Sequence, residues 1–333
     1  MTTTDHEDPS SEGREIPSAD LPTHPRQVTV GILTYRRPGS LVSTLDSLRP
    51  LADDLPATSW RLHDVLIVDN DRTPSARDAV DALIEAGHPL PLRYRHEPTP
   101  GLAAARNRAL DDAGGDVLVF IDDDEVAEPG WPDGLLRVMV TTGAALVGGP
   151  VRTRFSHQPP TWVVDGGLFD RPEPPDGTPQ TWLRSGNLAI DLMQIRVHGL
   201  RFNQRFAFSG GEDTDFSLRA RRLGLGLQWS AAAVVTEIVG PDRTTLAWLT
   251  RRERRATANW VRAEVAGDPT LRRRALISAR ATTRVAQGLA LTAAGVATRR
   301  RSRAARGLMR VSRGLGSFHG LAGGTRPEYG AQA

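Results

Sequence analysis

The 333-residue chain contains no cysteine and no lysine. Without cysteine there are no disulfides or thiolate metal sites, so any metal must be held by carboxylates, imidazoles or water. No stretch approaches the roughly 20 apolar residues of a membrane-spanning helix, and the longest apolar run, residues 285–298, contains Gln287 and Gly288. The N-terminus has acids and prolines in place of the basic start and apolar run of a signal peptide. We therefore expect a cytoplasmic protein.

Charge is distributed unevenly along the chain. All 42 basic residues are arginine; residues 251–333 hold 18 of them against four acidic residues, whereas residues 1–250 hold 24 against 35. Residues 1–25 are rich in Thr, Ser, Pro and acids and have too little apolar content to fold, which predicts a disordered tail. We expect one α/β domain over residues 26–250 and an arginine-rich helical region over residues 251–333 whose last residues are disordered.

Short apolar segments alternate with amphipathic ones through the first 250 residues. Strands are predicted at 28–35, 64–70, 92–97, 116–125 and 186–191. Helices are predicted at 40–48, 101–113 and 210–224, and a further helix after the second strand ends at residue 86. This alternation predicts an α/β fold with a Rossmann-like, doubly wound and mostly parallel sheet. Ligands of such sheets bind at the carboxyl ends of the strands, where Asp69 and residues 122–124 fall. The proline-rich segment 155–180 is expected to form a mobile loop over that site.

Three consecutive aspartates, Asp122, Asp123 and Asp124, end the strand predicted at 116–125. Their mutual repulsion costs stability unless a cation or a proton relieves it. Asp122 and Asp124 are two residues apart, so on an extended backbone they point the same way and could share one Mg²⁺ or Mn²⁺ with diphosphate oxygens. The alternative is an acidic loop that caps the next helix.

A second acidic segment runs from Gly210 to Asp215 at the start of a predicted helix. Paired glycines let the backbone approach a ligand closely, and the positive end of a helix favours an ionised carboxylate, which could act as a general base. The alternative is a helix cap with an acidic first turn. Asp69 could bond a base or ribose or form an Asx turn, and Arg106 could face a phosphate or lie in solvent.

Together these segments resemble family 2 glycosyltransferases of the GT-A fold, most closely the bacterial members that build polysaccharides or decorate lipids and natural products. The resemblance covers about residues 29–255 and is carried, in order, by TVGILTYRRP, LIVDN, PGLAAARNRAL, VFIDDDE, GNLAI and GGEDTDFSLRARRLG. It implies a single-step inverting transfer from a UDP-sugar or other nucleotide-diphosphate sugar to a hydroxyl acceptor, assisted by Mn²⁺ or Mg²⁺.

The resemblance also implies residue roles. Thr34, Tyr35 and Asp69 should hold the nucleotide. Asp122 and Asp123 should contact the ribose and the sugar or phosphate, with Asp122 also near the metal that Asp124 binds. Asp213 should be the general base, with Glu212 touching the acceptor. The remaining donor-binding and metal candidates are Arg106, Arg251, Arg254 and Glu237.

Three of these candidates lie after the second acidic segment. Many relatives carry a metal-binding histidine where this chain has Glu237, and a carboxylate could still ligate Mg²⁺ or Mn²⁺. Arg251 and Arg254 fall where relatives place basic residues that clamp the diphosphate, a role that suits bidentate arginine. The alternative for each arginine is a basic helix face.

Arginine clusters alternate with Ala, Leu and Val over residues 271–314. This pattern suits helices on an anionic membrane surface, where the protein would be peripheral and the acceptor could be lipid-linked. A solvated helical cap is the alternative; nucleic acid is disfavoured because stacking aromatics are scarce there. There are two alternative functions. One is a sugar nucleotidyltransferase, which the chain's lack of a glycine-rich basic N-terminal loop disfavours, and the other is a non-enzymatic membrane or nucleic-acid adaptor that uses the basic tail.

Overall fold

The computed structural model describes residues 25–52, 60–207 and 209–323. The predicted disordered tail lies outside these residues except for Pro25, and so do residues 324–333 at the other end of the chain.

An eight-stranded sheet forms the centre of the molecule, in the order β3-β2-β1-β4-β9-β6-β10-β8. Neighbours among β3, β2, β1 and β4 are parallel, whereas β9 is antiparallel to both β4 and β6. The bounds are β1 (Arg26–Thr34), β2 (Trp60–Asp69), β3 (Leu92–His96), β4 (Val117–Asp122), β6 (Leu146–Gly148), β8 (Thr178–Pro179), β9 (Asn187–Asp191) and β10 (Leu227–Trp229). The strands predicted from the apolar runs are thus confirmed, with shifted ends.

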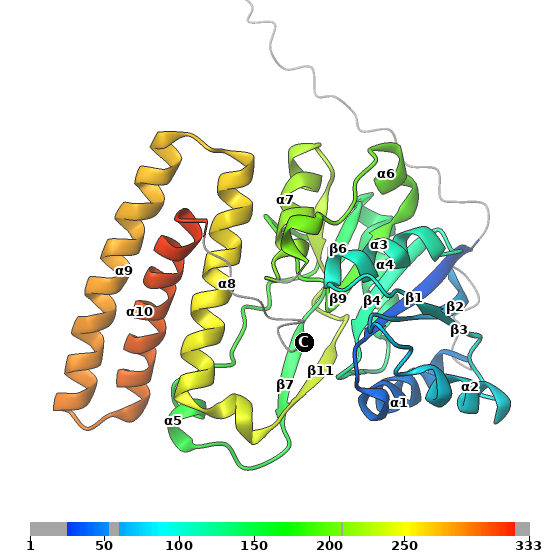
Figure 1. Cartoon of the computed structure of the whole chain (residues 1–333), viewed down its shortest axis with the longest axis horizontal. Coiled ribbons are helices and arrows are strands. Elements are labelled where there is room, and N and C mark those ends of the chain that lie inside the picture. Colours follow the sequence, from blue (N-terminus) through cyan, green and yellow to red (C-terminus); the bar gives the residue numbers. More distant parts are fainter. Residues whose placement is uncertain (1–24, 53–59, 208, 324–333) are drawn as a thin grey trace, which may run out of the picture.

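Helices cover both faces of this sheet (Figure 1), because its central strands are apolar on both sides. In β2, Val65 and Ile67 face one core and Leu66 and Val68 the other. The first core is closed by α1 (Pro38–Ser47), α2 (Arg77–Glu85) and α4 (Trp131–Thr142). The second is closed by α3 (Leu102–Asp112), α6 (Leu192–Val197) and α7 (Glu212–Arg222). Short connections form η1 (Arg49–Ala52), α5 (Thr161–Val164), η2 (Gln204–Phe206) and η3 (Pro241–Thr244).

A second sheet of three strands, in the order β5-β11-β7, lies beside the carboxyl end of β4. Its strands are β5 (Glu125–Ala127), β11 (Val235–Val239) and β7 (Val151–Phe155). The register places Glu237 of β11 opposite Glu125 of β5 and Thr153 of β7. This small sheet therefore brings a carboxylate from late in the chain to the acidic end of β4.

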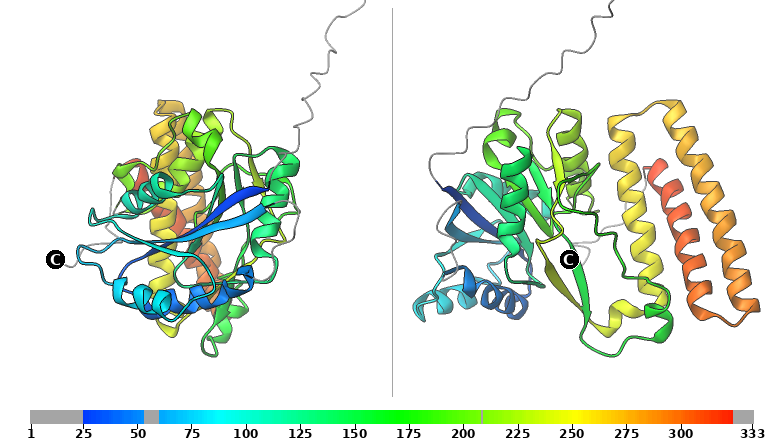
Figure 2. Two further views of the ribbon diagram at one scale, coloured as in Figure 1. Left: turned by 90° about the vertical axis from the view of Figure 1, so that its right-hand side faces the viewer. Right: turned by 180° about the vertical axis from the view of Figure 1, so that it is seen from behind.

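Three long helices follow the sheets: α8 (Leu246–Gly267), α9 (Leu271–Ala297) and α10 (Arg301–Leu321). The right-hand view of Figure 2 shows α8 nearest the sheet and α9 outermost. Glycines let α10 approach its neighbours: a Cβ on Gly307 would lie 2.3 Å from Thr292 Oγ1 of α9, and one on Gly316 would lie 2.4 Å from the Arg254 carbonyl oxygen of α8. Among the described helices, none is both long enough and apolar enough to cross a membrane.

Candidate active site

The end of β4 departs from the sequence expectation. The strand stops at Asp122, and Asp123 and Asp124 form a tight turn into β5, so the extended backbone assumed for all three aspartates is wrong. The chain turns because β5 pairs with β11 in the second sheet. Thr34, at the end of β1, donates a hydrogen bond of 2.8 Å to Asp123. Although the backbone turns, Asp122 and Asp124 still line one cavity.

This cavity, of about 240 Å³, lies at the carboxyl edge of the central sheet. Six of the predicted site residues line it, contributed by α3, the β4–β5 turn, α7 and β11: Arg106, Asp122, Asp124, Glu212, Asp213 and Glu237. Tertiary folding therefore joins the two acidic segments that the sequence singled out, together with Glu237. We call this the acidic cavity.

Asp122 and Glu125 have raised pKa values in the acidic cavity. Burial raises the pKa of Asp122 to about 7; Arg106 opposes this shift, whereas the charges of Asp124, Asp123 and Glu237 add to it. Burial likewise raises the pKa of Glu125 well above its usual value, with a further contribution from Asp122. The lining of the acidic cavity thus holds six carboxylates against three arginines, a surplus of negative charge that a bound cation would relieve.

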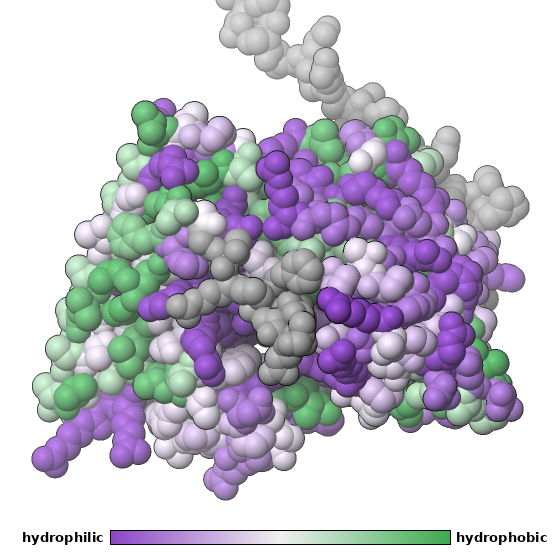
Figure 3. All heavy atoms as spheres, in the orientation of Figure 1, coloured by the Kyte–Doolittle hydropathy of each residue, from purple (hydrophilic) through white to green (hydrophobic). Residues whose placement is uncertain are grey.

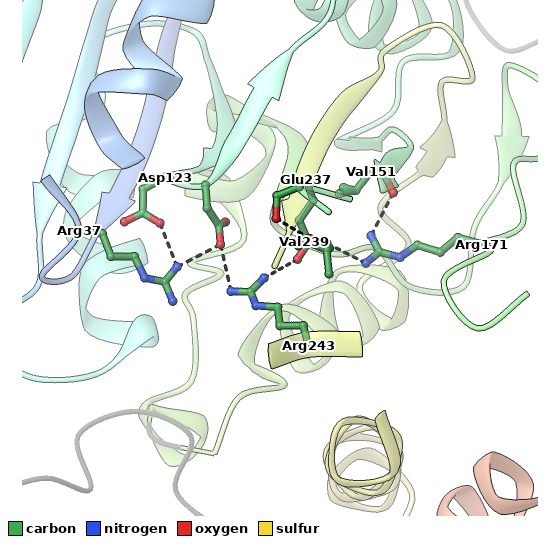
Figure 4. A network of polar contacts seen from close by, with 9 residues as sticks. Arg37, Asp123, Val151, Arg171, Glu237, Val239 and Arg243 are labelled. Atoms are coloured by element: carbon green, nitrogen blue, oxygen red, sulfur yellow. Dashed lines mark hydrogen bonds and ion pairs between the residues drawn. The ribbon is translucent and has the colours of Figure 1, made fainter. Parts of the chain in front are cut away.

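Three arginines bind the rim of the acidic cavity (Figure 4). Arg37 lies 3.1 Å from Asp124, and Arg243 lies 3.3 Å from Asp124 and 2.9 Å from Glu237. Arg171 lies 3.2 Å from the other Glu237 oxygen. Sequence reasoning missed all three. The available signal was that Arg37 lies three residues after the end of the first strand, at the same sheet edge as the aspartates.

The carboxylates of the acidic cavity are hard oxygen ligands of the kind that Mg²⁺ and Mn²⁺ take. The Asp122 carboxylate accepts no hydrogen bond from any residue that the structure describes, so its oxygens are available to a cation. Within the same residues, no three carboxylate or imidazole groups are gathered as a metal site. Arg243 pairs with both Asp124 and Glu237. The donor chemistry of Asp122 and Asp124 fits a divalent cation, whereas both oxygens of Glu237 are taken by arginines.

Arg106 and Glu212 form a buried ion pair between α3 and α7. Their side chains are only 6% and 3% exposed, and neither Arg106 Nε nor Glu212 Oε2 has another partner in the described part of the chain. The structure therefore gives both residues a partner that the sequence did not predict. Their predicted contacts with the donor and the acceptor stay predictions.

Asp213 lies next in the chain and lines the acidic cavity from the first turn of α7. Gly210 and Gly211 adopt φ values of +73° and +90°, which glycine tolerates and other residues rarely adopt. The Asp213 carboxylate accepts hydrogen bonds of 2.6 Å from the Thr214 amide and 3.2 Å from its hydroxyl.

Other predicted residues lie apart from the acidic cavity. Asp69 is fully buried, and one of its oxygens accepts hydrogen bonds from the Ala76 amide at 2.7 Å and the Tyr94 hydroxyl at 2.9 Å. These bonds hold the turn after β2, and a nucleotide contact by Asp69 stays a prediction. Tyr35 is exposed and follows β1.

Arg251 and Arg254 are exposed on α8 and line neither of the two cavities described for the molecule, whereas their neighbour Arg252 does line the larger one. The helical register of α8 decides this, because residues one position apart face different directions. The predicted contact of Arg251 and Arg254 with the diphosphate stays a prediction.

Comparison with known proteins agrees with this architecture. The model of the glycosyl transferase family 2 matches residues 29–202. Succinoglycan biosynthesis protein ExoM of Rhizobium meliloti (strain 1021) is 36% identical over 243 residues, which cover 71% of this chain and 74% of that protein. The mannosyltransferase PcManGT of Pyrobaculum calidifontis, in complex with GDP-Man and Mn²⁺, superposes with a TM-score of 0.58 at 21% identity over 88% of each chain.

The structural likeness shows a shared GT-A fold, as the sequence pattern predicted. The family match spans the strands and turns that build the acidic end of β4, and the 36%-identical relative supports the same assignment over a longer stretch. This chain therefore belongs to glycosyl transferase family 2 and is a glycosyltransferase.

Proposed function

We propose that the chain is an inverting glycosyltransferase that moves a sugar from a nucleotide-diphosphate sugar to a hydroxyl acceptor with the help of Mn²⁺ or Mg²⁺. One observation carries this proposal: Asp213, at the start of α7, lines the same cavity as Asp122 and Asp124. A candidate base and a candidate cation site thus face one cavity at the sheet edge where ligands of α/β folds bind.

Asp213 is the general base of the proposed reaction. It takes the proton of the acceptor hydroxyl as that oxygen attacks the anomeric carbon, while the bond from the anomeric carbon to the diphosphate oxygen breaks. A single displacement inverts the configuration and needs no covalent enzyme intermediate. The proton stays on Asp213, and the nucleoside diphosphate leaves with the electron pair of the broken bond.

Positively charged groups receive the leaving diphosphate. A divalent cation held by Asp122 and Asp124 would neutralise its growing charge. Arg37 and Arg243 contact Asp124 and supply further positive charge at the rim of the acidic cavity. Asp123 faces Thr34 at the end of β1, and these two residues with Tyr35 and Asp69 are the proposed nucleotide contacts.

Relatives support the choice of substrates. PcManGT is in complex with GDP-Man and Mn²⁺, and ExoM is named for succinoglycan biosynthesis. We propose a UDP-sugar or another nucleotide-diphosphate sugar as donor, and a glycan, a lipid-linked molecule or a natural product as the hydroxyl acceptor.

The proposal extends to a peripheral position at an anionic membrane, on the cytoplasmic side. Leu271, Leu289 and Val296 are 84%, 56% and 67% exposed, and their spacing of 18 and 7 residues places them on one face of α9. Figure 3 shows apolar side chains over this part of the surface, with a hydrophilic group below them. Arginines at residues 272–274 and 299–301 stand at the two ends of α9. An apolar face between basic ends suits adsorption to anionic lipids.

Calorimetric titration of nucleotide-diphosphate sugars, with and without Mn²⁺, tests the donor and metal assignments. We expect the wild type to bind a donor more tightly with Mn²⁺, and Asp124→Ala to lose this metal-dependent gain. Asp111→Ala is the matched control, because Asp111 is also paired with an arginine but is 54% exposed and does not line the acidic cavity. An Asp124→Ala variant that bound donor as tightly as the control would remove Asp124 from the site.

A further inference from the structure

A second, larger cavity of about 880 Å³ lies beside the acidic cavity. Its walls come from the sheet edge at residues 148–151, the irregular segment 166–174, residues 180–187 and helices α8 and α10. The two cavities share Val151, Arg171 and Arg184 in their linings, so the larger one adjoins the space that Asp213 lines. Part of the segment predicted as a loop over the site therefore forms a wall of this second cavity, which we call the arginine cleft.

The arginine cleft carries a surplus of positive charge. Its lining contains six arginines against three acidic residues: Arg171, Arg184, Arg252, Arg306, Arg310 and Arg313 against Asp170, Glu173 and Glu253. Glu253 pairs with Arg313, Glu173 pairs with Arg152 outside the cleft, and Arg171 pairs with Glu237. Four lining arginines, Arg184, Arg252, Arg306 and Arg310, are left without a carboxylate at ion-pair distance in the part of the chain that the structure describes.

Aromatic rings hold two of these four arginines in place. The Arg252 guanidinium lies 5.7 Å from the centre of the Phe169 ring and 5.3 Å from that of Trp248, and these rings are stacked. The Arg184 guanidinium lies 5.4 Å from the Trp182 ring. Such contacts orient a guanidinium without neutralising it.

The pKa values of Arg184 and Arg252 reflect their lack of a paired carboxylate among the described residues. Burial and the nearby charge of Arg171 lower the pKa of Arg252 to about 10 and also lower that of Arg184. Many protein atoms surround Arg184, but its side chain lines both cavities and is therefore still accessible to water. The guanidinium groups of Arg184 and Arg252 are both repelled by that of Arg171, and a bound anion would relieve this repulsion.

The other two arginines come from α10. Arg306 and Arg310 are four residues apart and Arg313 follows at three, so all three lie on one face of the helix. Gly307 and Gly314 each directly follow one of these arginines, so they point roughly 100° away from the arginine face, and there they pack against α9. The close packing of α10 on α9 thus determines which face of α10 lines the arginine cleft.

We propose, resting on the function proposed above, that the arginine cleft binds the acceptor through a phosphate or diphosphate group and presents the acceptor hydroxyl to Asp213. A phosphate group accepts hydrogen bonds from several guanidinium groups at once and matches their paired donors. In the proposed function, the donor diphosphate binds at the cation held by Asp122 and Asp124. The arginines of the cleft are therefore available to bind a second anionic group. Trp182 and Trp229 in the walls add apolar surface for the rest of the acceptor.

Calorimetry with the full-length protein tests this assignment after Mn²⁺ and nucleoside diphosphate have filled the donor site. The probes are a soluble sugar diphosphate, the same sugar diphosphate with a long alkyl chain, the neutral methyl glycoside and a methyl glucuronide. The variant is Arg306→Gln/Arg310→Gln, and the matched control is Arg280→Gln/Arg284→Gln, which removes two exposed arginines from α9 with the same spacing. All four side chains are exposed, so both variants should unfold at the wild-type temperature, which a thermal scan verifies.

We expect the sugar diphosphate to bind at least tenfold more tightly than the neutral glycoside, and the α10 variant to lose at least tenfold in affinity while the α9 control does not. Added salt should weaken this binding. Either diphosphate form supports the assignment: tighter binding of the alkyl form indicates a lipid-linked acceptor, and equal binding indicates a soluble one.

Three results would overturn the assignment. They are equal binding of neutral and phosphorylated probes, an α10 variant that binds like the control, and a glucuronide that binds as well as the diphosphate. If the wild type does not bind nucleoside diphosphate with Mn²⁺ at the first step, that result contradicts the proposed function. It is distinct from the three results that contradict the assignment of the arginine cleft.

Discussion

Removing one partner of the buried Arg106–Glu212 pair should destabilise this protein more than any exposed ion pair can. Glu212→Leu leaves a guanidinium that is 6% exposed without its ion-pair partner, and Arg106→Met leaves a carboxylate that is 3% exposed without its own. Breaking a buried pair from one side typically costs about 3–5 kcal/mol, because the remaining charge is buried and uncompensated. That is a large share of the roughly 5–15 kcal/mol that stabilises a native protein.

The double variant separates the charge effect from the packing effect. Arg106→Met/Glu212→Leu removes both charges and keeps similar side-chain volumes, so it should cost much less than either single change or be neutral. The expected coupling energy is therefore at least about 2 kcal/mol, above the usual range for exposed pairs. Asp46→Asn is the control, because Asp46 and Arg49 form a pair at 2.9 Å whose side chains are 53% and 51% exposed.

Urea unfolding followed by tryptophan fluorescence measures these differences. The reasoning is refuted if each single variant costs no more than Asp46→Asn, which should cost roughly 0.2–0.5 kcal/mol. It is also refuted if the double variant costs the sum of the two single changes, since the two charges would then act independently.

Three further predictions concern the base, the helices and the membrane. Asp213→Asn should lower kcat by about 10²–10⁴ and change donor affinity little, and steady-state kinetics with unchanged kcat would place the base elsewhere. Gly307→Ala should lower the free energy of unfolding by roughly 1–2 kcal/mol, because the clash with α9 outweighs the better helix propensity of alanine. Gly39→Ala in α1, where a Cβ meets nothing within 4 Å, should not lower it in the same urea titration. Leu289→Glu/Val296→Glu should reduce sedimentation with anionic vesicles, whereas equal sedimentation would exclude this face of α9.

The order of elements and the position of the site followed from local patterns in the sequence. Apolar runs ending in Asp69 and in Asp122 predicted strands whose carboxyl ends share one edge, and the structure places them in parallel β2, β1 and β4. The glycine pair before Asp213 predicted a helix start near a ligand, and that residue does line the acidic cavity. Such features are readable because strand period, helix start and strand end depend on residues close together in the chain.

Side-chain partners could not be read from the sequence in this way. Arg106 and Glu212 are 106 residues apart, and Arg243 lies 119 residues from Asp124. The pairing of β11 with β5 and β7 brings Glu237 to the acidic cavity, and no local pattern specifies which strands meet. Arginine in particular carries no local signal of its partner, since its long side chain serves equally well in solvent, in an ion pair or over an aromatic ring.

The sequence by itself determined that this is an α/β glycosyltransferase with carboxylates at the strand ends, because those features are written in short segments. Only the tertiary structure decided that Arg37 and Arg243 hold Asp124, that Arg106 is paired with Glu212, and that one face of α10 lines a cleft. Those outcomes depend on how sheets and helices pack at long range, where a one-residue difference in helical register exchanges a lining arginine for a solvent-exposed one.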